Sequence, residues 1–130
     1  MKLAEGSDVT IVATGLMVHL ALAAKELLKA DGISAEVINI HTIKPLDTEL
    51  IAASASKTGA VVTAEEHNII GGLGGAVCEA LAGLCPVPVL RVGVEDMYGR
   101  SGKVPALLEI YGLTAANIAA KAKAVVGMKK

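Results

Sequence analysis

Two glutamates and a histidine, Glu65, Glu66 and His67, directly follow a nearly unbroken apolar run. A carboxylate and an imidazole at the end of a buried strand could do acid–base work, because such positions shift pKa values. The structural alternative is a salt bridge or a cap by which a glutamate anchors the loop that follows. One of the two glutamates should point toward the end of the sheet and the other away. We expect no catalytic residue in the chain on its own.

A glycine-rich segment, Gly71–Gly75, comes next and could cradle a phosphate. Such a cradle exposes backbone N–H groups at a helix N-terminus, and glycine permits the close approach of an anion. The dinucleotide fingerprint is incomplete, because Val77 stands where a third glycine or alanine belongs. No G-K-[ST] sequence follows either. Alternatively, the glycines let the following helix pack closely on a sheet.

A threonine and a glycine, Thr14 and Gly15, also end an apolar run. In open α/β sheets, ligands bind beyond the carboxyl ends of the strands. We therefore predict one candidate anion or interface site at these strand ends. It consists of Thr14, Gly15, Glu65, Glu66, His67, Gly71, Gly72 and Gly74.

Two further loops are candidate interface segments. His41 and Lys44 lie in a run that either connects a strand to a helix or contacts a partner. The second loop is either an interface loop or a plain surface loop, and it holds one of only two tyrosines, a residue type favoured at interfaces. Its candidate residues are Asp96, Tyr98, Arg100 and Ser101.

The metal-ligating residue types are too scattered for a metal site. No two histidines stand at metal-ligand spacing, so we predict none, and His19 is expected to be a partly exposed helix residue. Cys78 and Cys85 are seven residues apart, which fits neither a C-x-x-C motif nor a zinc knuckle. Both are expected to be small, reduced core residues.

Composition limits the class of protein. The 130 residues suit one domain, residues 1–130, and 53% apolar content with a net charge of −1 excludes intrinsic disorder. A charge so near zero, with 2% aromatic residues, argues against nucleic-acid binding. The apolar run Leu16–Ala24 is too short to span a membrane. With no signal peptide recognised, the expected location is cytoplasmic.

Strand-like and helix-like patterns alternate along the chain. Four strand-like runs separated by helices predict an α/β fold with a parallel sheet covered on both faces. Pro88 and Arg91 place the fourth strand at the sheet's edge. The expected strands are Asp8–Gly15, Ala35–Ile40, Gly59–Glu65 and Val87–Val94, and the expected helices are Leu16–Asp31, Asp47–Lys57, Ile70–Leu84, Pro105–Tyr111 and Ala115–Val126.

Local signals locate the ends of these helices and the apolar face of the first. Asp47 and Thr114 are expected N-caps, and Gly32 and Gly59 are expected C-terminal stops. The apolar stripe of the first helix is expected to be Leu16, Leu20, Ala24, Leu27 and Leu28.

Nearly the whole chain, from about Glu5 to Val126, resembles the C-terminal domain of transketolases, especially those whose C-terminal half is a separate subunit. The segments EEHNIIGGLG and D-x-Y-G-x-S-G are the more specific part of this resemblance, while K-P-L-D is shared with related enzymes. The matching segments are Glu5–Gly15, Ile40–Asp47, Lys57–Val77, Val92–Gly102 and Tyr111–Ile118.

The resemblance implies a three-layer α/β/α domain with a mostly parallel sheet of five strands. The first strand of the family is antiparallel and lies at an edge, so Lys2–Ala4 would be its remnant beside four parallel strands. We predict that Lys2–Ala4, or another chain, covers the edge of strand Ala35–Ile40.

The resemblance also implies which functions other domains supply. In the family, thiamine diphosphate and its Mg²⁺ or Ca²⁺ are bound by a G-D-G…N motif that this sequence lacks, with Ala30-Asp31-Gly32 the nearest string. No cofactor or catalytic residue is therefore expected in this chain. The implied partners are the thiamine-diphosphate-binding and pyrimidine-binding domains or subunit, and the implied role is assembly, including a homodimer.

Three alternatives remain open. One is a free-standing module that binds a small anion at Gly71–Gly75 and Thr14-Gly15. The second is the corresponding domain of a 2-oxoacid dehydrogenase β subunit, and the third that of a 1-deoxyxylulose-5-phosphate synthase. The segment D-x-Y-G-x-S-G favours transketolase over the dehydrogenase.

Overall fold

A computed structural model describes residues 1–15, 17–40, 46–68, 72–94 and 114–129. The side chains of residues 66–68 and 94 lie outside this description. Within it, the elements are β1 (Lys2–Ala4), β2 (Val9–Ala13), α1 (Met17–Ala30), β3 (Ala35–Asn39), α2 (Thr48–Thr58), β4 (Val61–Asn68), α3 (Leu73–Leu84), β5 (Val89–Val94) and α5 (Ala115–Val126).

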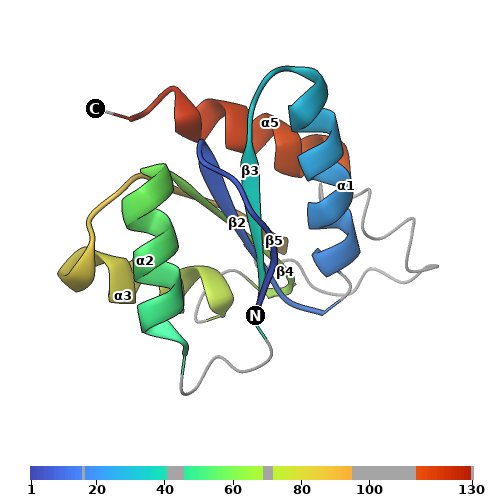
Figure 1. Ribbon diagram of the computed structural model, residues 1–130. Coiled ribbons are helices and arrows are strands. Elements are labelled where there is room, and N and C mark those ends of the chain that lie inside the picture. Colours follow the sequence, from blue (N-terminus) through green and yellow to red (C-terminus); the bar gives the residue numbers. More distant parts are fainter. Residues whose placement is uncertain (16, 41–45, 69–71, 95–113, 130) are drawn as a thin grey trace.

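The five strands form one sheet between two layers of helices, in the order β1-β3-β2-β4-β5 (Figure 1). Helices α1 and α5 cover one face, and α2 and α3 cover the other (Figure 1). Strands β2 to β5 are mutually parallel, and β1 alone runs antiparallel. The three-layer α/β/α fold is therefore confirmed.

Both edges of the sheet are as predicted. Strand β1 pairs with β3, with Lys2 opposite Ile38, so Lys2–Ala4 does cover that edge. Strand β5 forms the other edge, with Pro88 just before it and an exposed Arg91 within it. A proline and a charge disfavour further strand pairing there.

The predicted helix ends are confirmed by their hydrogen bonds. Asp47 accepts a bond of 3.2 Å from the Leu50 amide at the start of α2, and Gly59 ends that helix at φ 76°. Thr114 accepts one of 3.1 Å from the Asn117 amide at the start of α5. Gly32, with φ 77°, follows α1. The predicted helix Pro105–Tyr111 lies outside the described residues.

The apolar stripe of α1 is confirmed at Ala24 and Leu28 but is rotated from the predicted one at its other positions. The side chains that face the sheet are Met17, Ala21, Ala24 and Leu28, while Leu27 is 46% exposed. Leu20 is only half-buried, and Leu16 lies outside the described residues. The small alanines permit a close approach of the helix to the sheet, which outweighs the larger apolar area of the leucines.

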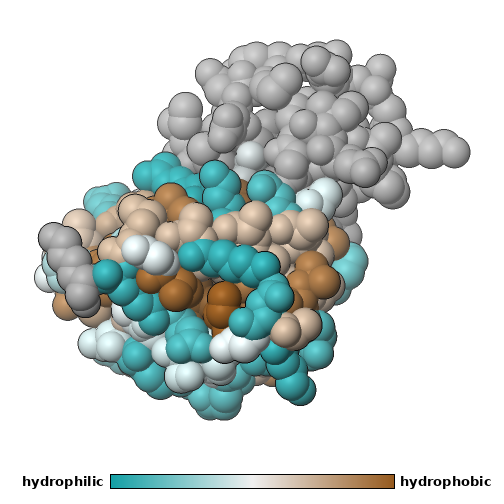
Figure 2. Space-filling view, turned by 90° about the horizontal axis from the view of Figure 1, so that it is seen from above, coloured by the Kyte–Doolittle hydropathy of each residue, from teal (hydrophilic) through white to brown (hydrophobic). Residues whose placement is uncertain are grey.

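Two apolar clusters fill the space between the layers. Ile11 and Met17 belong to the cluster under α1 and α5, and Val12 and Leu73 to the cluster under α2 and α3. The outer surface is mixed: on the face seen in Figure 2, hydrophobic side chains reach the surface between hydrophilic ones.

The two cysteines differ from their prediction. Cys78 and Cys85 are free but only half-buried, so their expected place in the core is wrong. Cys85 is the C-cap residue of α3 and packs at the margin of the cluster under α2 and α3. The apolar pattern of α3 predicted burial for both, but the sheet covers only one side of this helix.

Candidate functional site

Among the residues predicted at the strand ends, Glu65 has a buried side chain that is bonded by two hydrogen-bond donors. It lies in β4 with 1% of its surface exposed. Its carboxylate accepts hydrogen bonds from the Leu73 amide at 2.7 Å and from the Gly74 amide at 3.2 Å. These are the first two amides of α3, whose N-cap residue Gly72 has no side chain to bond them. Glu65 thus caps α3, as the structural alternative proposes.

This cap changes what the glycine-rich segment offers to an anion. Two of the backbone N–H groups that would cradle a phosphate already bond a carboxylate. An anion at the same place would meet the negative charge of Glu65 as well as lose those donors. In the described part of the segment, the first two amides of α3 therefore already have an acceptor within the protein.

Thr14 and Gly15 lie at the neighbouring strand end. The Thr14 amide donates to the Ala64 carbonyl at 3.2 Å, which joins the end of β2 to the residue before Glu65. The Thr14 and Gly15 carbonyls accept bonds from the Met17 and Val18 amides at 3.1 and 3.2 Å. Thr14 and Gly15 therefore form the turn into α1, next to the Glu65 cap.

The other predicted site residues lie outside the described part of the chain. Glu66 and His67 belong to β4 by their backbone, but their side chains are not described. The remaining ones are Gly71 of the glycine-rich segment, His41 and Lys44 of the first loop, and Asp96, Tyr98, Arg100 and Ser101 of the second. Their roles in anion binding or at an interface stay predictions.

Gly74 and Gly75 differ in the space around them, although they are adjacent in α3. A Cβ at Gly74 would lie 2.8 Å from Arg91 Cδ and 3.0 Å from Thr63 Oγ1. A Cβ at Gly75 would meet nothing within 4 Å. Arg91 is exposed and can move, but Thr63 is buried in β4. Close packing of α3 on the sheet thus requires glycine at position 74 and not at 75.

We expect opposite effects from alanine at these two positions. Gly75→Ala should raise the free energy of unfolding by about 0.5–1 kcal/mol, because alanine loses less backbone entropy in a helix. Gly74→Ala should lose that gain and end about 1–2 kcal/mol below Gly75→Ala, because Thr63 must shift. Urea unfolding of both variants measures the difference. Equal stabilisation by the two would contradict the packing argument.

The described residues do not fit thiamine diphosphate or its metal. They contain no group of three or more His, Cys, Asp or Glu side chains that could hold a metal ion. The helix start that could receive a diphosphate is capped by the Glu65 carboxylate.

A second polar cluster, which sequence reasoning missed, lies at the amino ends of the strands. The Glu36 carboxylate in β3 is fully buried and accepts hydrogen bonds from Ser54 Oγ and Lys57 Nζ of α2. Lys2 Nζ of β1 lies 3.5 Å from the same carboxylate. Thr10 Oγ1 of β2 extends the cluster to Ser54 Oγ at 2.7 Å and Thr58 Oγ1 at 2.8 Å.

The electrostatics of this Glu36 cluster favour the charged carboxylate. Burial alone raises the pKa of Glu36, but the hydrogen bonds from Lys57 and Ser54 and the charges of Lys57 and Lys2 outweigh it and lower the pKa to about 2. The hydrogen bonds to Glu36 and Glu5 raise the pKa of Lys57. A carboxylate held ionised this firmly cannot act as a proton donor near neutral pH, so the cluster is structural.

Comparison with known proteins places this fold in a family. The profile described as "Transketolase, C-terminal domain" matches residues 1–118. The 6-deoxy-6-sulfo-D-fructose transketolase subunit SqwH of Clostridium sp. (strain MSTE9) is 54% identical over 98% of this chain and 39% of its own length. A putative transketolase C-terminal section of Methanocaldococcus jannaschii is 52% identical over 90% of this chain and 36% of its own length.

The similarity extends to a related enzyme and to solved structures. A 1-deoxy-D-xylulose-5-phosphate synthase of Heliobacterium modesticaldum is 50% identical over 93% of this chain, which covers 19% of that enzyme. A solved structure described as "Split gene transketolase, inactive beta4 tetramer" superposes with a TM-score of 0.96 at 51% identity, over 100% of this chain and 43% of that one. The chain thus spans less than half the length of these relatives.

None of the described helices is long and apolar enough to cross a membrane.

Proposed function

Because the chain belongs to the transketolase C-terminal domain family, we propose that it is the noncatalytic assembly part of a transketolase-type enzyme. The complete enzyme would transfer a two-carbon ketol unit between sugar phosphates. Thiamine diphosphate and its Mg²⁺ or Ca²⁺ would be bound by the thiamine-diphosphate-binding and pyrimidine-binding domains or subunit. The proposed location of the enzyme is the cytoplasm.

One observation supports the noncatalytic role above the others. The buried Glu65 carboxylate at the strand ends accepts its hydrogen bonds from the start of α3. It is a helix cap, and its oxygens are not presented to a substrate. The chain also matches only 36–39% of the length of two transketolase relatives, which leaves the larger part of the enzyme to supply the chemistry.

We further propose that the working assembly contains two copies of this chain. The 51%-identical structural neighbour is a tetramer of one subunit type, which supports self-association in this branch of the family. That tetramer is described as inactive.

Reconstitution tests the assembly role. The chain is mixed with the thiamine-diphosphate-binding part from the same source, and ketol transfer from xylulose 5-phosphate to ribose 5-phosphate is assayed. A second arm offers 6-deoxy-6-sulfo-D-fructose as donor, since the name of the 54%-identical relative contains it. We expect activity only in the mixture. Activity of the chain alone, or a partner equally active without it, would contradict the proposal.

A second candidate is the corresponding domain of a 1-deoxy-D-xylulose-5-phosphate synthase, supported by the 50%-identical relative. The same mixtures, assayed for that synthase activity, separate the two enzymes. The anion-binding module is tested by thermal shift with inorganic phosphate. Saturable stabilisation that Gly72→Val removes would favour it over the assembly role.

A further inference from the structure

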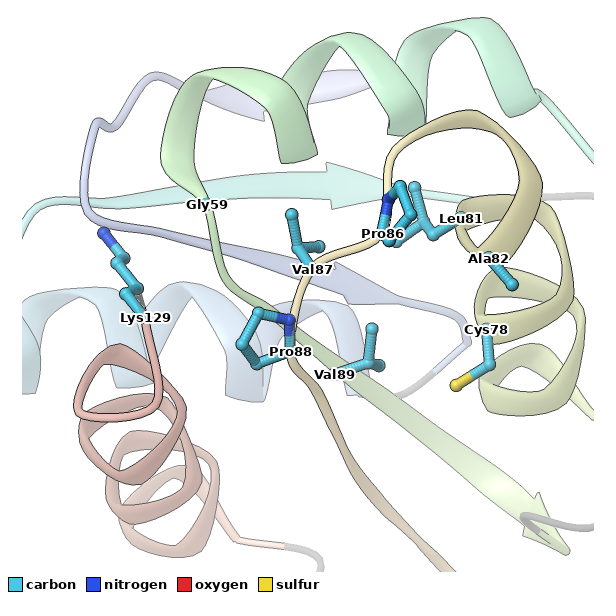
Figure 3. A pocket seen from close by; sticks show the side chains of 9 residues that line it. All are labelled: Gly59, Cys78, Leu81, Ala82, Pro86, Val87, Pro88, Val89 and Lys129. Carbon is cyan, nitrogen blue, oxygen red and sulfur yellow. The ribbon is translucent and has the colours of Figure 1, made fainter.

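A hollow of about 700 Å³ lies between the second half of α3 and the entry to the edge strand β5 (Figure 3). It is at the amino ends of the parallel strands, so it is separate from the strand ends at which Glu65 caps α3. Its volume is within the range of about 300–1,000 Å³ that is typical of small-molecule sites. The lining residues are Gly59, Cys78, Leu81, Ala82, Pro86, Val87, Pro88, Val89 and Lys129.

The walls of the hollow offer hydrocarbon and almost no hydrogen-bonding groups. Apart from Cys78 and Lys129, every lining residue is apolar. Pro86 and Pro88 have no amide hydrogen, and the Pro88 carbonyl already accepts a bond of 3.0 Å from the Val61 amide. A peptide strand therefore finds no donor at these positions, and a sugar hydroxyl would lose its bonds to water without replacement. The occupant that fits this space is mostly hydrocarbon.

One end of the hollow carries a single cation, Lys129, which follows α5 (Figure 3). Its stem packs on the turn after α2, because a Cβ at Gly59 would lie 3.6 Å from Lys129 Cδ and 3.8 Å from its Cε. Lys129 is half-buried and has no ion-pair partner among the residues described. None of the lining residues is acidic. A partly desolvated ammonium group without a counter-ion attracts an anionic group.

We propose that the hollow binds a medium-chain carboxylate, with its hydrocarbon tail along Val87–Val89 and its carboxylate at Lys129. Figure 3 shows Cys78 at the other end of the hollow, with its sulfur directed toward Val89. The tail of the ligand would therefore cover the Cys78 thiol. This site is independent of the proposed assembly function, because it requires only elements of this chain.

The two cysteines give an internal test, because both are free and half-buried but only Cys78 lines the hollow. The full chain carrying Cys85→Ser is alkylated with iodoacetamide at increasing decanoate concentrations. We expect the rate at Cys78 to fall about tenfold at about 10 mM decanoate, with half-saturation at or below about 1 mM. In the matched Cys78→Ser variant, decanoate should leave the alkylation of Cys85 unchanged. Circular dichroism confirms that both variants are folded.

The charge of Lys129 is tested in the same Cys85→Ser background. Lys129→Gln keeps most of the aliphatic stem but removes the charge, so it should raise the half-saturating decanoate concentration about fivefold. The matched control is Lys29→Gln, at an exposed lysine of α1, which should leave that concentration unchanged. Decanol has the same tail without the charge, so it should bind the wild type no better than it binds Lys129→Gln.

Four results would overturn this site. One is the absence of saturable protection of Cys78 at up to about 10 mM decanoate. Another is equal protection of Cys78 and Cys85, which would indicate detergent-like binding over the whole surface. A third is an unchanged affinity of Lys129→Gln for decanoate. The last is protection of Cys78 by the thiamine-diphosphate-binding part without decanoate, which would assign the hollow to a contact with that partner.

Discussion

Glu36→Ala is expected to lower the free energy of unfolding by about 3 kcal/mol, as typically follows when one partner of a buried ion pair is removed. The carboxylate has no exposed surface and joins three elements: β3 carries it, α2 supplies Ser54 and Lys57, and β1 supplies Lys2. Without it, Ser54 and Thr10 keep their mutual bond but lose the acceptor that orients them. Urea unfolding monitored by circular dichroism measures the loss.

Two further variants make this expectation specific to the charge. Glu36→Gln keeps the shape and one oxygen acceptor, so it should lose less stability than Glu36→Ala. Glu26→Ala, at an exposed position of α1, is the control and should stay within about 0.5 kcal/mol of the wild type. If Glu36→Ala unfolds at the same urea concentration as this control, the cluster contributes nothing to the fold.

The same carboxylate should make stability depend on acid. Its pKa is lowered from the ordinary 4.5 to about 2 in the folded chain, which corresponds to about 3 kcal/mol. Since the folded pKa is the lower one, this stabilisation is complete above pH 4.5 and disappears as the pH falls through about 2. The wild type should therefore lose its greater free energy of unfolding relative to Glu36→Gln as the pH falls from 4.5 to about 2. A constant difference between the two would contradict the assigned pKa.

Local sequence signals predicted the parts of the fold that depend on neighbouring residues. Asp47 bonds an amide three residues on, and Gly59 needs only its own backbone freedom to end α2. The proline and arginine of the fourth strand likewise identified the edge without knowledge of the other strands. These features are determined within a few residues of the chain, so their prediction required no tertiary structure.

The features that were missed depend on which elements meet. Glu36 bonds side chains 18 and 21 residues away, and its third partner, Lys2, lies in β1, the edge strand that pairs with β3. The only local hint was a polar side of α2, formed by Ser54, Lys57 and Thr58. In α1 the pattern favoured Leu20 and Leu27, but packing on the sheet buries Met17 and Ala21 in their place.

Glu65 shows what local sequence patterns can predict at the strand ends and what they cannot. Alternation along β4 places Glu65 on the same side as Val61 and Thr63, the side that α2 and α3 cover. Local patterns do not reveal which face α3 covers, so either glutamate was eligible as the cap. Only the position of α3 identifies Glu65 as the residue whose carboxylate meets the Leu73 amide.

The link between β1 and β2 leads to the second large expected effect, that of Gly6→Ala. A Cβ at position 6 would lie 2.2 Å from the Ala35 carbonyl carbon, 2.3 Å from the Glu36 amide nitrogen and 2.5 Å from the Ala35 oxygen. All three atoms are backbone, so no side-chain rotation can relieve the clash. The link must move away from β3, at a cost of about 3 kcal/mol, the upper end of what overpacking typically causes.

The displacement should reach bonds that lie on either side of Gly6. Lys25 Nζ donates to the Glu5 carbonyl at 2.9 Å and to the Ala35 carbonyl at 2.5 Å, so a shifted link pulls these two acceptors apart. The Asn39 amide, which donates to the Met1 carbonyl at 2.8 Å, should exchange its hydrogen faster as β1 loosens.

Hydrogen exchange of residues 35–39, measured beside urea unfolding, separates this loss of edge pairing from a general destabilisation. Gly83→Ala is the control, because a Cβ there meets nothing within 4 Å and the helix gains from alanine. Stability of Gly6→Ala equal to the wild type, with β3 still protected, would mean that β1 does not depend on this close approach. The pairing of β1 with β3 and the Glu36 cluster would then hold this edge of the sheet without it.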